Sequence, residues 1–263
     1  MIVLGLDTAT PATAVGLRLA DGTTLRAYDE PEAGARPGHT TQALALASEL
    51  LAQAGIGWGA LERIAVGVGP GTFTGLRVGI ATARGLAQSL GIEVVGVSSL
   101  WVLAQAALWE PDSQMRCALA AIDARRGEAF AAAYDAQGEV APPRALPPEE
   151  LAAIPGELGG DREWLAVGDG ALRFRGYLEA IAVAVPVDTS PLHRVDAGVL
   201  CELALSAPAG DPEAVLPDYR RRPDAEIALE AGEPGPSIFQ SKGGAAGEPN
   251  PSAFQSKTRG SLK

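Results

Sequence analysis

The glycine-rich stretch Gly69-Pro70-Gly71-Thr72 is the first part of this sequence whose residue types could do chemistry. It follows an apolar run at residues 66–68 and precedes a segment with helical periodicity, which indicates a sharp strand-to-helix turn. Because N–H groups at a helix start bind anions, Gly69, Gly71 and Thr72 are candidate phosphate ligands. The spacing matches neither a Walker loop nor the dinucleotide-binding fingerprint, so a purely structural turn is an equally good interpretation.

Asp7 and Thr8 form a second polar site at the end of an apolar run, residues 2–6. Ligands of α/β proteins collect beyond the C-terminal ends of the strands, which makes Asp7 the best-placed carboxylate in the chain. Aspartate also stabilises turns by accepting hydrogen bonds from its own backbone. Both interpretations of Asp7 stay open at this level.

The other reactive residue types form no familiar catalytic pattern. His39 stands at an expected helix start, and Gln42 and Ala43, three and four positions later, offer no second metal ligand on that face. Cys117 and Cys201 lie far apart in apolar surroundings, which predicts buried thiols rather than a disulfide or a metal pair. We therefore assign no catalytic residue and no metal ligand.

Composition narrows the class of protein. The chain has 263 residues, of which 47% are hydrophobic, and a net charge of −11. This acidity argues against a stand-alone nucleic-acid binder, because phosphate neutralisation needs clustered Lys and Arg. No apolar run is long enough for a membrane span and the N-terminus lacks the features of a signal peptide, so we expect a cytoplasmic protein with no membrane partner.

Hydrophobic periodicity predicts an α/β protein of two domains and a tail. The expected domains are residues 1–110, residues 111–223 and a disordered stretch at 224–263. Strands are expected at residues 2–6, 13–20, 23–28, 64–68, 93–97, 117–122, 129–134, 165–167 and 182–187. Helices are expected at residues 40–54, 74–90, 99–108, 171–181 and 195–205, with a short one after Pro147. Thr40 or Thr41 would cap the first of these helices, and Thr72 or Thr74 the second.

Two helices of the first half have features of a packing surface. Leu44 and Leu51 belong to the apolar face of the first, and the second carries Leu76 beside a ridge of small residues at four-residue spacing: Gly75, Gly79, Ala83 and Ala87. A glycine inside a helix costs about 1 kcal/mol relative to alanine, so Gly79 and Gly85 need a reason. Such a ridge allows close helix approach, either to the protein's own sheet or to a partner subunit.

The tail contains a repeat. The segment GEPGPSIFQSK at residues 232–242 returns as GEPNPSAFQSK at residues 247–257, and each copy has one aromatic residue. Residues 232–263 carry a net charge of +2, which leaves −13 on the rest of the chain. A duplicated linker and a paired docking motif both remain possible for this segment.

Three motifs resemble one known family. They are Leu4-Gly5-Leu6-Asp7-Thr8-Ala9-Thr10, Gly69-Pro70-Gly71-Thr72-Phe73-Thr74-Gly75-Leu76-Arg77-Val78-Gly79 and Gly96-Val97-Ser98-Ser99-Leu100, and together they resemble the TsaB (YeaZ) family. The segments Asp123-Ala124-Arg125-Arg126-Gly127 and Gly168-Asp169-Gly170 are similar to family segments more weakly. The resemblance covers residues 1–222.

The resemblance implies a fold, a process and partners. The implied fold is the two-domain actin-like ATPase (ASKHA, ribonuclease H-like) fold, with mixed sheets and flanking helices. The implied role is that of a scaffold subunit in making threonylcarbamoyladenosine in transfer RNA. In that role it would pair with and activate the catalytic paralogue TsaD, with the ATPase TsaE as a further partner. Transfer RNA would then be met only through the complex, and a homodimer could form when the partner is absent.

The family pairs its subunits through the two helices described above, which implies an interface at Leu44, Leu51, Gly75, Leu76, Gly79, Ala83 and Ala87. Asp7, Thr8, Gly69, Gly71 and Thr72 would then be a vestigial nucleotide site, with no firmly bound cofactor and ATP or ADP only at the partner interface. The alternative is an enzyme in its own right, either a nucleotide-dependent phosphotransferase or ATPase on this fold, or a metallopeptidase.

Overall fold

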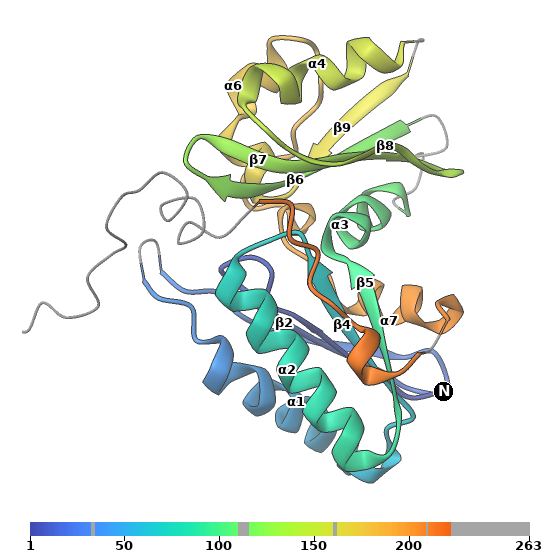
Figure 1. Cartoon of the computed structure of the whole chain (residues 1–263). Coiled ribbons are helices and arrows are strands. Elements are labelled where there is room, and N and C mark those ends of the chain that lie inside the picture. The colour runs from blue at the N-terminus through green and yellow to red at the C-terminus, as the bar shows by residue number, and fades with distance from the viewer. Residues whose placement is uncertain (33–34, 110–115, 160–161, 209, 222–263) are drawn as a thin grey trace, which may run out of the picture. The chain divides into compact units, whose positions relative to one another are not determined.

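The computed structural model describes residues 1–32, 35–109, 116–159, 162–208 and 210–221 (Figure 1). Met1–Arg221 form one compact unit. The expected domain boundary near residue 111 and the expected tail both lie outside the described residues. Within the described part of the chain, no helix is both long and apolar enough to cross a membrane.

The N-terminal half is built on a five-stranded sheet with the order β3-β2-β1-β4-β5. Its strands are β1 (Val3–Asp7), β2 (Thr13–Arg18), β3 (Thr24–Asp29), β4 (Arg63–Gly69) and β5 (Glu93–Ser98). β2 pairs antiparallel with β1 and β3, whereas β4 pairs parallel with β1 and β5. The central strand β1 is buried along its whole length, as its apolar sequence predicts.

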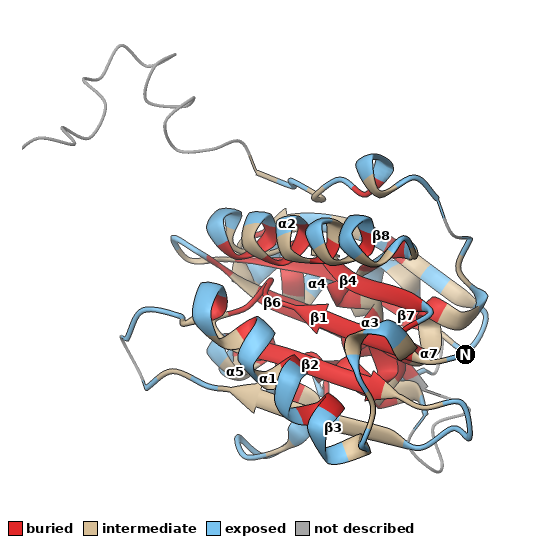
Figure 2. Ribbon diagram, turned by 90° about the horizontal axis from the view of Figure 1, so that it is seen from below, coloured by how far each residue is buried: buried red, intermediate tan, exposed pale blue. Residues whose placement is uncertain are grey.

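Helices cover both faces of this sheet. On one face lie α1 (His39–Ala54) and α2 (Phe73–Leu90), whose leucines and alanines pack against β1, β2 and β4. On the other face lie α3 (Ser99–Leu108) and α7 (Ala197–Ser206). Figure 2 shows α1 and α2 with their buried sides toward the strands and their exposed sides turned outward.

The C-terminal half repeats this plan on a smaller scale. Its strands β6 (Arg116–Arg125), β7 (Glu128–Asp135), β8 (Gly138–Leu146) and β9 (Glu163–Val167) have the order β8-β7-β6-β9. The helices α4 (Pro148–Leu158), α5 (Asp169–Arg173) and α6 (Arg175–Glu179) pack on one face, and α3 packs on the other. Short 3₁₀ turns lie at Trp58–Ala60, Pro191–His193 and Pro212–Ala214.

The two sheets share one topology. In each half the first strand pairs antiparallel with the second and parallel with the fourth, and the third strand extends the antiparallel side. This duplication confirms the expected fold class, an α/β protein with mixed sheets and flanking helices of the actin-like type.

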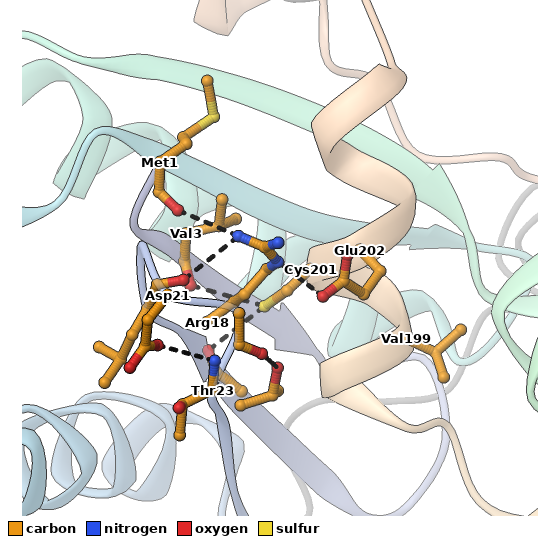
Figure 3. Close-up of polar contacts among 12 residues, drawn as sticks. Met1, Val3, Arg18, Asp21, Thr23, Val199, Cys201 and Glu202 are labelled. Carbon is orange, nitrogen blue, oxygen red and sulfur yellow. Dashed lines mark hydrogen bonds and ion pairs between the residues drawn. The ribbon is translucent and has the colours of Figure 1, made fainter.

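The contact between α7 and the first sheet depends on glycine and cysteine. A Cβ atom on Gly16 would lie 2.4 Å from the carbonyl oxygen of Ala197, so only glycine lets the helix approach this closely. The Cys201 thiol donates to the carbonyl oxygens of Val3 and Gly16, and Arg18 forms an ion pair with Glu202 at 2.6 Å (Figure 3). Burial raises the pKa of the Cys201 thiol to about 12, which fits the expected inert thiol.

Three sequence-based predictions of secondary structure are wrong. Residues 138–146 form β8, although no strand was expected there because the segment contains Pro142 and Pro143. Prolines are tolerated in β8 because it is an edge strand. The strand expected at residues 182–187 is reduced to one bridge between Leu165 and Ala184. The helix expected at residues 171–181 is two five-residue helices.

The helix starts agree only in part with the expected caps. Gly38, not Thr40 or Thr41, is the N-cap of α1, and no side chain caps that helix. Thr72 takes the N-cap position of α2, but its side chain accepts no capping hydrogen bond. Ser98 does cap α3, its hydroxyl accepting from the N–H of Trp101 at 3.4 Å.

Candidate functional site

The two loops expected to hold a phosphate lie against each other. The N–H of Thr72 donates to the carbonyl oxygen of Ala9 at 2.8 Å. A Cβ atom on Gly71 would lie 2.3 Å from the same oxygen, and one on Gly69 would lie 2.9 Å from the Leu76 side chain. The glycines therefore admit the protein's own backbone rather than a ligand.

Asp7 is buried beneath these loops, with 1% of its surface exposed. The Ser99 hydroxyl donates to one carboxylate oxygen at 2.6 Å, and the N–H of Ala9 donates to the other at 2.9 Å. Burial raises the pKa of Asp7 to about 6, although both hydrogen bonds act to lower it. Since a Cβ atom on Gly67 would overlap the carboxylate, Gly67 makes the space that Asp7 fills.

Thr8 joins the same internal network. Its hydroxyl donates to the carbonyl oxygen of Gly75 at 2.7 Å, and its own carbonyl oxygen would lie 2.0 Å from a Cβ atom on Gly75. A Cβ atom on Gly79 would lie 2.3 Å from the Thr8 hydroxyl. The small-residue ridge of α2 thus packs on the turn between β1 and β2. This close packing explains the glycine at position 79.

The structure brings the five residues of the expected phosphate site together, and their polar groups bond to Ala9, Gly75 and Ser99. Asp7, Thr8 and Thr72 use the groups described above for contacts within the chain, while Gly69 and Gly71 are packed against neighbouring atoms. The structural interpretation of this turn, left open by the sequence, is the one that the geometry favours.

The seven residues expected at a subunit interface divide into two groups. Leu51, Gly75, Leu76, Gly79, Ala83 and Ala87 are buried within this chain, whereas Leu44 is 42% exposed. The six buried residues contact their own sheet because they form the inner faces of α1 and α2, so as direct partner contacts they are misplaced. An interface on this helix pair has to use its outer face instead, and that interface stays a prediction.

The outer face of the helix pair has mostly small side chains and few charged ones. α1 and α2 together contain three charged residues, Glu49, Arg77 and Arg84. The exposed residues of the two helices are Thr40, Thr41, Leu44, Ala45, Ser48, Glu49, Ala52 and Gln53 on α1, and Phe73, Thr74, Arg77, Ala81, Gly85, Gln88 and Ser89 on α2. We call these residues the outer helix face.

Gly85 is the residue of the outer helix face that the chain itself does not explain. It lies in the interior of α2, and a Cβ atom there would meet nothing within 4 Å. An exposed helical glycine costs about 1 kcal/mol relative to alanine. Unlike Gly79, it has no internal neighbour that requires the missing side chain.

A cleft of about 310 Å³ lies between the two halves. Thr10, Pro11 and Glu30 line it from the N-terminal half, and Asp169 and Arg194 from the C-terminal half. Glu30 pairs with Arg194 at 2.7 Å, and burial raises the pKa of Asp169. Sequence reasoning did not find this cleft, because its walls come from segments far apart along the chain.

The two histidines contact protein groups. Nδ1 of His39 lies 2.9 Å from the Thr13 hydroxyl, and the ring nitrogens of His193 lie near the carbonyl oxygens of Gly168 and Pro186. Among the described residues, no group of three or more His, Cys, Asp or Glu side chains could hold a metal ion. Burial lowers the pKa of His39, which favours its neutral form.

The duplicated mixed sheets and the loops that close on Asp7 define an actin-like α/β protein whose glycine-rich loop packs against its own chain. A family model described as TsaD: tRNA N6-adenosine threonylcarbamoyltransferase matches residues 30–228. The chain is 38% identical over 178 residues to the tRNA threonylcarbamoyladenosine biosynthesis protein TsaB of Escherichia coli, covering 65% of this chain and 72% of that protein. It is 27% identical over 236 residues to TsaB of Bacillus subtilis, covering 86% and 96%.

A solved structure supports the same family assignment as these sequence comparisons. YeaZ from Pseudomonas aeruginosa is 32% identical, with a TM-score of 0.69 over 83% of this chain and 99% of that one. The chain therefore belongs to the TsaB (YeaZ) family, as its motifs indicated.

Proposed function

We propose that this protein is the non-catalytic partner subunit of a complex that makes threonylcarbamoyladenosine in transfer RNA. Its TsaB-named relatives support involvement in this biosynthesis. The matched family model describes the catalytic transferase, a protein of related sequence that is the natural candidate for the partner. The pairing would place the outer helix face against a TsaD-like subunit and activate it.

The observation that carries this proposal is Gly85 on the outer helix face. Gly85 lowers the stability of α2, and no contact inside the chain offsets that loss. A glycine at this position would, however, allow a partner helix to approach closely. The surrounding face also has the low charge of an interface core, with Leu44 and Phe73 as exposed apolar anchors.

The scaffold role also fits the closed phosphate loop. The N–H of Thr72 and the hydroxyl of Thr8 donate within the chain, so we place ATP or ADP at the interface with the partner rather than in the loop. A TsaE-like ATPase would join this cytoplasmic complex, and the same face would support a homodimer when the partner is absent.

Cells from which this gene is deleted provide the test. We expect their transfer RNA to lack threonylcarbamoyladenosine, and a plasmid copy to restore it, as measured by mass spectrometry of digested nucleosides. Normal levels of the nucleoside in the deletion strain would contradict the proposal.

Calorimetry separates the scaffold from a stand-alone enzyme. We expect no heat when ATP and magnesium are added to the isolated protein. Tight ATP binding that disappears in Asp7→Ala would instead favour an independent nucleotide-dependent enzyme.

A further inference from the structure

The last described residues connect the two halves of the molecule. Residues 210–221, which we call the strap, run alongside α2 toward β6 and β7 (Figure 1). Arg84 of α2 donates to the carbonyl oxygen of Glu213 at 2.9 Å, and the N–H of Asp218 donates to the carbonyl oxygen of Val68 at 2.8 Å. At its end, Arg221 donates to the carbonyl oxygen of Ala124 in the C-terminal half at 2.7 Å.

Arginines gather where the strap meets the turn between β6 and β7. Asp123 accepts from the guanidinium groups of Arg125, at 3.3 Å, and Arg173, at 2.9 Å. Arg221 pairs with Glu128. We call the following six residues the arginine patch: Arg77, Arg125, Arg126, Arg173, Arg220 and Arg221.

The arginine patch concentrates positive side chains on a chain whose net charge is −11. Among the described residues, Asp123, Glu128 and Asp218 pair with its arginines, and Asp169 accepts from the N–H of Asp123. Arg125, Arg173 and Arg220 keep 61%, 42% and 39% of their side chains exposed, so their outer edges face solvent.

The backbone of the turn is unfavourable for arginine. Arg125 and Arg126 have φ angles of 63° and 53°, in the left-handed region that favours glycine. A two-residue hairpin turn with this geometry prefers Asn-Gly, whereas this chain has Arg126-Gly127. Residues held in such conformations collect at functional sites, which makes these two arginines candidates for contact with a ligand.

Aromatic rings lie at one end of the patch. Phe73 and Tyr219 stack with their centroids 5.2 Å apart, and they are 37% and 40% exposed. The guanidinium of Arg77 lies 3.7 Å from the centroid of Phe73 and donates to the Tyr219 hydroxyl at 2.9 Å. Tyr219, which is not part of the outer helix face, offers an exposed ring beside these arginines, and this suits a ligand with both phosphates and stacked bases, which favours RNA over an acidic peptide.

We propose that the arginine patch contacts the phosphate backbone of transfer RNA in the assembled complex. This inference rests on the proposed function and changes one expectation, that RNA is met only through other subunits. The net charge of the chain argued against a stand-alone nucleic-acid binder, but net charge does not show how the strap and the turn concentrate arginines.

The test is binding of a fluorescently labelled, unmodified transfer RNA transcript to the complex of the full chain with its TsaD-like subunit. The variant is Arg125→Gly/Arg126→Gly, which relieves the backbone strain and is expected to melt at a higher temperature than the wild type. The control is Arg36→Ala/Arg144→Ala, which removes two exposed arginines elsewhere. We expect weaker binding in the first variant alone, with the slope of log affinity against log salt reduced by about two.

Two results would overturn the inference. One is a salt slope in the glycine variant equal to that of the wild type. The other is displacement of the transcript from this patch by ATP or pyrophosphate at low concentration, which would assign the patch to a free nucleotide.

Pairing with the TsaD-like subunit is measured separately by co-elution. If the wild type does not pair, the proposed function fails, and the same salt slopes measured on the full chain alone still decide the RNA contact.

Discussion

Asp7 shows how one residue can look like a catalytic group and act as a structural one. Its position after β1 predicts a ligand site, but its carboxylate points into the protein, toward Ser99 and the N–H of Ala9. The sequence predicted the position and not the direction, because direction depends on Gly67 in a neighbouring strand. Distant residues of this kind are the part of a site that local motifs do not contain.

The buried carboxylate makes stability depend on pH. The pKa of Asp7 is raised from 3.8 to about 6, so the folded protein holds this proton more tightly than the unfolded chain. The stabilising effect is full below pH 3.8 and is lost as the pH rises through 6. One pKa unit is worth about 1.4 kcal/mol, so the whole effect is about 3 kcal/mol.

We predict that Asp7→Asn removes this dependence. The asparagine amide can accept from Ala9 and donate to the Ser99 hydroxyl, and it never ionises. In urea unfolding, the free energy of unfolding of the variant relative to the wild type should increase between pH 4.5 and 7.5. Asp188→Asn, at a side chain that is 83% exposed, is the control for the substitution itself. An equal difference for Asp7→Asn at both pH values would show that Asp7 has no raised pKa.

At the scale of elements, the strands β1 to β7 and β9 and the long helices could be predicted because their apolar periodicity is local. The edge strand β8 could not, since its prolines are acceptable only with β7 on one side and no neighbour on the other. The ridge of α2 was recognised as a close-packing surface, but periodicity does not tell which side of a helix faces the sheet and which faces solvent. The inner position of the ridge required the fold.

Replacing a buried glycine and an exposed glycine of α2 with alanine should have opposite effects on the stability of the protein. We predict that Gly75→Ala destabilises the protein by about 1–3 kcal/mol, because the new methyl group meets the carbonyl oxygen of Thr8. Gly85→Ala should stabilise it by about 1 kcal/mol, because the methyl group enters open space on a helix. Thermal unfolding of the two variants measures both changes. Shifts of the same sign would show that the ridge is not packed as described.

At the scale of the whole molecule, two halves of one topology are joined by the helices between the sheets and by the strap. The outer helix face and the arginine patch meet near Arg77, where α2 contacts Tyr219 of the strap. A partner subunit on the first and RNA on the second would therefore be neighbours. The duplicated segment at residues 232–257 follows the strap and lies outside the described residues.

The affinity of this protein for the proposed TsaD-like subunit, measured by calorimetry, tests the central claim most directly. Gly85→Leu is compared with Gly156→Leu, because both glycines are exposed in helices with open space around them and only Gly85 lies on the outer helix face. We predict that Gly85→Leu weakens the pairing at least about tenfold, a change of 1.4 kcal/mol, while Gly156→Leu leaves it unchanged. Wild-type affinity in Gly85→Leu would contradict the account.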